Sequence, residues 1–256
     1  MTDKGINNRV RWRLGLCLWV AGMLGVAALT LSVIPQLTVG TAPPLPLPVL
    51  ILASMVQSAL LLALVVWVGV SLAPKTGFVT PAFDAIAKGD DVLAALRHQL
   101  KPALLTGIVA GVLLFLLGGY ASPAAIAQAE QQFTVPLLAR ILYGGITEEL
   151  LLRWGLMTFL VWLMWRFIQA QQGRPRPMFI WVAIVVSSVL FGLGHLPAAA
   201  MQVGTLSGDV VLFVVGANTV FGIIFGYLYW RYSLEAAMIA HATAHLTSYA
   251  MSMGLA

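Results

Sequence analysis

The chain has 256 residues, of which 60% are hydrophobic and only 9% are charged, and its mean hydropathy is +0.93. Soluble domains carry about 25% charged residues, so this composition excludes an ordinary soluble fold and predicts an all-α, polytopic helical membrane protein. The net charge of +5 comes mostly from short arginine clusters beside apolar segments, which predicts contact with membrane lipid and no nucleic-acid partner.

Apolar segments recur along nearly the whole length, so we expect one membrane domain over residues 1–256. The first span is expected at 14–34. It is longer than the apolar region of a signal peptide, so we expect it to stay uncleaved, with a cytoplasmic N-terminus beside its arginines. Further spans are expected at 49–72 and 102–120. A short amphipathic helix on the cytoplasmic face is expected between them, with its apolar residues at Phe83, Ile86, Ala87, Val92, Leu93 and Leu96.

The second half of the chain contains a mainly apolar stretch, 133–168, that is too long for one simple span. Because Gly144 and Gly145 interrupt it, we expect a half-helix, a broken helix at these glycines, and a full span from about residue 146. Spans at 178–196, 210–230 and 234–253 follow. The total is seven or eight transmembrane helices, with 14–120 as amino-terminal spans and 133–253 as the core.

Five ionisable residues lie inside these apolar segments, namely Glu148, Glu149, His195, His241 and His245. A charge at mid-bilayer costs roughly 2.5 kcal/mol or more, so such residues are candidates for a functional site. Glu149 and Arg153 are four residues apart on a helix, and we expect them to form an ion pair that holds the shape of the site. Glu148 then lies on another face of the helix, where it needs a histidine, a metal or water beside it.

The histidines occur at helical spacing. Phe191 and His195 are four residues apart, so we expect the aromatic ring to pack against the imidazole. His241 and His245 have the spacing of paired ligands in zinc helices. One unpaired carboxylate and three imidazoles from three helices predict hydrolysis by an activated water. In this interpretation His195, His241 and His245 hold a divalent metal, Zn²⁺, and the carboxylate is the general base.

At these residues the chain resembles the CAAX prenyl proteases and bacteriocin-processing enzymes, the CPBP or Abi family of intramembrane proteases. The resemblance covers roughly residues 146–253. The EExxxR motif is matched by Glu148, Glu149 and Arg153, the FxxxH motif by Phe191 and His195, and the first position of the third motif by His241. The family has Asn or Asp four residues later, where this chain has His245.

The resemblance implies a membrane-embedded endopeptidase that hydrolyses a peptide bond in a membrane-associated or prenylated protein or peptide. Glu148 and His195 would activate the water, and His241 and His245 would complete metal binding or stabilise the oxyanion. Glu149 and Arg153 would hold the site together. Whether a metal takes part stays open. A chain rich in Ala, Leu and Gly favours the plasma membrane of a prokaryotic cell.

Two other functions stay open. The chain could be a non-enzymatic membrane protein that confers immunity to a peptide toxin or scaffolds a partner, in which case Glu148→Gln would leave that function intact. It could also bind haem or translocate protons through its buried histidines, and the haem version requires a Soret band in the purified protein.

Overall fold

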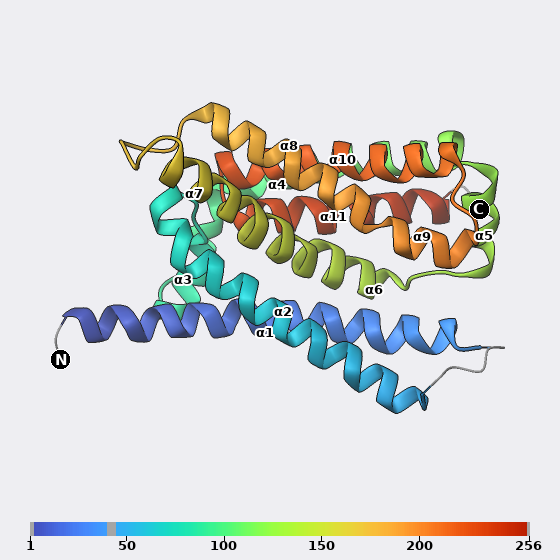
Figure 1. Ribbon diagram of the computed structural model, residues 1–256, viewed down its shortest axis with the longest axis horizontal. Coiled ribbons are helices and arrows are strands. Elements are labelled where there is room, and N and C mark those ends of the chain that lie inside the picture. Colours follow the sequence, from blue (N-terminus) through green and yellow to red (C-terminus); the bar gives the residue numbers. More distant parts are fainter. Residues whose placement is uncertain (1–2, 40–44, 255–256) are drawn as a thin grey trace.

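The computed structural model describes residues 3–39 and 45–254, and the described residues form helices and no strand. Figure 1 shows the first two long helices lying together along one side of the molecule, with α8, α10 and α11 on the other. The helices are α1 (Asp3–Leu37), α2 (Leu47–Thr76), α3 (Pro81–Lys88), α4 (Val92–Leu116), α5 (Ala124–Gln132), α6 (Leu137–Ala139), α7 (Thr158–Phe167), α8 (Pro177–Gly194), α9 (Leu196–Val203), α10 (Gly208–Arg231) and α11 (Leu234–Gly254). Three π-helical segments complete them: η1 (Leu117–Ala121), η2 (Arg140–Glu148) and η3 (Leu150–Met157).

In the described part of the chain, six helices are long and apolar enough to cross a membrane. The all-helical membrane architecture is therefore confirmed, and the predicted count of seven or eight spans is not. The 21-residue helix α11 accounts for one of the missing spans. It packs against α4, α10 and η2, and most of its first half is buried. Because its side chains contact other helices, α11 does not need the apolar surface that lipid demands of a span.

The predicted break at Gly144 and Gly145 is wrong, because one uninterrupted helix runs from Leu137 to Phe167. Both glycines lie within η2 and bring it close to α11. A Cβ atom on Gly144 would lie 2.8 Å from Nε2 of His245, and one on Gly145 would lie 2.9 Å from Cβ of Ala242. The helix is wound as a π-helix here, and such segments are frequent at functional sites.

Small residues also set the positions of α10 and α11. A Cβ atom on Gly107 or Gly111 of α4 would lie 2.6 Å from the carbonyl oxygen of Ala240 or 2.7 Å from that of Ala244. A Cβ atom on Gly222 of α10 would lie 2.7 Å from Ser188 of α8. Helices in membranes associate closely where such small residues face each other. These contacts hold α11 at a fixed depth beside α4.

The amphipathic helix expected after the second span is α3, and it ends earlier than predicted. Residues from Val92 onward begin α4, where Asp91 caps the helix by accepting hydrogen bonds from the backbone nitrogens of Leu93 and Ala94. The buried carboxylate of Glu235, at the start of α11, accepts hydrogen bonds from the backbone nitrogens of Ala82 and Phe83 in α3. The first turn of α3 is thereby attached to the helix that carries His241.

Candidate active site

Glu149 and Arg153 form a fully buried ion pair inside the helix from Leu137 to Phe167. Nε of Arg153 lies 3.1 Å from Oε2 of Glu149, and neither side chain is exposed. Arg153 also donates a hydrogen bond from Nη2 to the carbonyl oxygen of Gly222 at 3.0 Å, and its guanidinium lies over the ring of Phe191. A buried charge pair is tolerated only with such additional partners, so these contacts hold η3 against α8 and α10.

The second oxygen of Glu149 has a partner that sequence reasoning missed. Oε1 lies 2.8 Å from Nδ1 of His241, which is 92 residues away on α11. An ionised carboxylate can only accept hydrogen bonds, so Nδ1 of His241 carries the proton and donates it. This contact fixes the orientation of the His241 ring, which is also stacked on Phe225 with ring centroids 4.5 Å apart. Nε2 of His241 is left facing Glu148.

His195 lies where α8 ends and α9 begins. Its Nδ1 is 2.9 Å from the carbonyl oxygen of Phe191, and since that oxygen can only accept, Nδ1 again carries the proton. The ring of Phe191 meets the imidazole edge-on at 4.6 Å. Both rings therefore carry a proton at Nδ1, and Nε2 of His195 also points toward Glu148.

Glu148 lies between these two histidines. Its Oε1 is 3.7 Å from Nε2 of His195, and its Oε2 is 4.0 Å from Nε2 of His241. Both separations exceed direct hydrogen-bond length and suit a bridging water. The Glu148 side chain is 14% exposed and that of His195 35% exposed, whereas Glu149 is fully buried. The two adjacent carboxylates thus differ in access, because only that of Glu148 faces an open region.

His245 reaches the site only through His241. The two rings stack with centroids 5.0 Å apart, and Nε2 of His245 lies against the backbone of Gly144. No ion pair joins His245 to Glu148 in the described part of the chain. The structure therefore brings together Glu148, His195 and His241. His245 contacts this group through its ring stacking on His241.

The predicted zinc centre does not fit this arrangement. Within residues 3–39 and 45–254, no three His, Cys, Asp or Glu side chains are placed so that they could hold a metal ion. Zinc needs its ligand atoms at about 2.0–2.2 Å, usually in a tetrahedron. His245 instead stacks on His241. The metal ion stays a prediction, and the chemistry proposed below uses the side chains alone.

Comparison with known proteins places the site within a family. Residues 130–247 match the family model described as type II CAAX prenyl endopeptidase Rce1-like. This range runs from α5 into α11 and contains every site residue discussed above. The comparisons found no similar curated protein and no similar solved structure. The match agrees with the motifs carried by the site, and the family is one of proteases. The match over residues 130–247 supports membership of the chain in the CPBP family of CAAX-type proteases.

Proposed function

We propose that the chain is an intramembrane endopeptidase in which Glu148 and His195 activate a water molecule. The proposal rests on three side chains that come together from three separate helices. They are the Glu148 carboxylate, which has no ion-pair partner on its own helix, and the imidazoles of His195 and His241, whose Nε2 atoms face it. A carboxylate at 3.7 Å and 4.0 Å from the two nitrogens leaves room for a water that donates one proton to Glu148 and the other to His195.

The reaction follows from these positions. Glu148 takes a proton from the water as its oxygen attacks the carbonyl carbon of the scissile peptide bond. The carbonyl oxygen becomes an oxyanion, which His241 in its imidazolium form stabilises from Nε2. Glu148 then passes the proton to the leaving nitrogen as the C–N bond breaks, so that a carboxylic acid and an amine are formed.

Glu149 and Arg153 support the role of His241. The imidazolium lies between the carboxylates of Glu148 and Glu149, and the guanidinium of Arg153 balances the charge of the second carboxylate. The two carboxylates, the imidazolium and the guanidinium then have a net charge of zero, which reduces the free-energy cost of burying them in the membrane. The metal-assisted version of the reaction is tested separately, by metal analysis of the purified protein beside its His241→Ala and His245→Ala variants.

We further propose that the substrate is a membrane-associated or prenylated peptide. Two observations support it: the family is named for CAAX prenyl endopeptidases, and the site lies among helices that are apolar enough to span a membrane. A peptide carrying a C-terminal CaaX motif and a prenyl group would be held at the membrane by that group.

The test is hydrolysis of a synthetic S-farnesyl peptide ending in a CaaX motif by the full chain in lipid vesicles, with products identified by mass spectrometry. The parent should release a truncated peptide, and Glu148→Gln should not. Asp209→Asn is the control, since Asp209 is an exposed carboxylate at the start of α10. Equal cleavage by the parent and Glu148→Gln would exclude Glu148 as the base. Absence of cleavage by the parent would remove the prenylated peptide as a substrate.

A further inference from the structure

A groove between α1 and α2 lies outside the candidate active site. Its volume is about 380 Å³, within the usual size range of ligand pockets. None of the residues that line it belongs to the site around Glu148. Its walls and mouth are formed by Asn8, Arg11, Trp12, Gly15, Leu16, Trp19, Ala63, Val66, Trp67, Val70 and Ser71.

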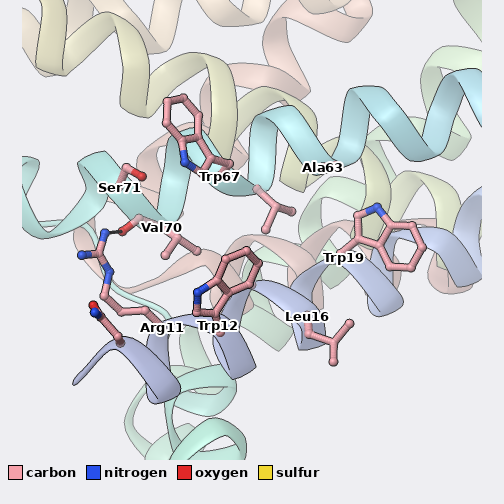
Figure 2. A pocket seen from close by; sticks show the side chains of 11 residues that line it. Arg11, Trp12, Leu16, Trp19, Ala63, Trp67, Val70 and Ser71 are labelled. Atoms are coloured by element: carbon pink, nitrogen blue, oxygen red, sulfur yellow. Dashed lines mark hydrogen bonds between the residues drawn. The ribbon is translucent and has the colours of Figure 1, made fainter. Parts of the chain in front are cut away.

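The groove has a polar end and an apolar body. Figure 2 shows Arg11 and Ser71 at one end, Trp12 and Trp67 facing each other from the two helices, and Trp19 at the far end. Trp12 is 82% exposed and Trp67 is 67% exposed, so neither ring is packed away in the protein. Tryptophan is enriched where a membrane protein crosses the boundary between headgroups and hydrocarbon. We therefore place the part of the groove between Trp12 and Trp67, next to its polar end, at that boundary.

The positive charge at the polar end is poorly satisfied by the protein. Arg11 donates one long hydrogen bond, from Nη2 to the carbonyl oxygen of Val70 at 3.4 Å, and no described carboxylate lies within ion-pair distance of it. Lys75 lies one turn beyond Ser71 on the same face of α2. An anionic group at this position would meet the guanidinium of Arg11 and the hydroxyl of Ser71, with Lys75 outside the groove.

We infer that this groove binds one anionic phospholipid, with its phosphate at Arg11 and an acyl chain between Trp12 and Trp67. The charge complementarity at the mouth and the apolar walls below it match the two halves of such a lipid. Basic pockets between membrane-spanning helices are known to bind anionic headgroups, and an arginine near the membrane surface contributes a several-fold gain in affinity.

The structure supplies a matched control for the charge. Arg13 lies two residues from Arg11 on the same helix and is exposed, but it does not line the groove. Gly15 supplies a second, independent variant. A Cβ atom there would lie 3.8 Å from Val66, an ordinary contact, so Gly15→Leu should fill the groove while leaving Arg11 in place.

The experiment is native mass spectrometry of the full chain, purified in mild detergent and incubated with phosphatidylglycerol or with phosphatidylcholine. The parent and Arg13→Gln should each retain one phosphatidylglycerol in preference to phosphatidylcholine. Arg11→Gln should retain it about five-fold less, and Gly15→Leu should lose lipids of both kinds. Equal retention of the two lipids by the parent, equal losses in Arg11→Gln and Arg13→Gln, or unchanged retention in Gly15→Leu would each overturn the inference.

Discussion

The pair α1 and α2 differs sharply from the helices that follow the loop after α5. In the most apolar stretch of α2, 11% of residues are buried, against 44% in the span that begins with α8. Among the described residues, the buried charged and histidine side chains all lie in the second group, namely Glu149, Arg153, Glu235 and His241. The buried polar residues of α1 and α2 are threonines, Thr30 and Thr76.

This difference shows what a charge needs in order to lie at membrane depth. In the second group every buried charge is held by a partner from another helix, as Glu149 is held by His241 and Arg153 by the carbonyl of Gly222. The α1–α2 pair also packs against η2, η3, α3 and α7, but its arginines are exposed and lie near the amino-terminal end of α1. Helices that face lipid keep their charges near the membrane surface, whereas helices that face one another can carry them inside.

Removing the cation of the buried pair should have the largest effect on stability. Arg153→Met leaves Glu149 buried with only His241 as a partner, and breaking a buried pair in this way costs about 3–5 kcal/mol of unfolding free energy. Arg13→Gln, in the lipid-facing group, should change this free energy little, because Arg13 is exposed. Unfolding of each variant in detergent mixtures measures both changes in unfolding free energy. Similar losses in the two variants would break the distinction between the two groups of helices.

The two histidines of α11 should differ in their contribution to turnover. His241→Ala removes the donor to the oxyanion and should lower kcat by about 10²–10³-fold. His245→Ala should lower it less, because His245 makes no ion pair with Glu148 in the described structure. Turnover of the S-farnesyl peptide measures both. Equal, complete losses accompanied by loss of bound metal would favour the zinc site predicted from the sequence.

The contact between the two groups of helices can be tested at Gly25. A Cβ atom there would lie 2.4 Å from the carbonyl oxygen of Leu142, a backbone atom that cannot move away easily. Gly25→Ala should separate α1 from η2 and cost up to about 3 kcal/mol. Gly15→Ala is the control on the same helix, since the new atom would make only an ordinary contact at 3.8 Å. Equal thermal midpoints for the two variants would argue against this close packing.

A smaller effect is expected at Gly144, where the new methyl group would meet a side chain. Gly144→Ala should push the ring of His245 aside and cost about 1–2 kcal/mol, with a several-fold loss of turnover. Gly118→Ala in η1 has no neighbour within 4 Å and should leave turnover unchanged. If Gly144→Ala behaved like Gly118→Ala in both measurements, the approach of η2 to α11 would be looser than the structure shows.

Much of the architecture was predictable because lipid imposes a simple pattern on sequence. Runs of apolar residues predicted the helical membrane fold, and the spacing of Glu149 and Arg153 predicted that they would meet. The count of spans failed at α11, because a helix whose first half is buried against other helices no longer follows the apolar pattern. Gly144 and Gly145 were misread because a glycine that breaks a helix and one that admits a neighbouring helix look the same in sequence.

The site was predictable as a set of residues but not as a geometry. Spacing along one helix cannot show that Glu149 meets His241, since the two are 92 residues apart. The same limit applies to His245, whose spacing from His241 suits a shared metal ion, while its ring stacks on His241 instead. The π-helical winding of η2 had no sequence signal that we recognised.

We propose separate roles for the two adjacent carboxylates, with Glu148 reacting and Glu149 holding the site together. The most direct test is to measure turnover and thermal unfolding of Glu148→Gln beside Glu149→Gln. We predict that Glu148→Gln unfolds at the temperature of the parent and loses turnover by at least about 100-fold, whereas Glu149→Gln unfolds at a lower temperature. Parental turnover in Glu148→Gln, or a drop in its unfolding temperature equal to that of Glu149→Gln, would contradict this account.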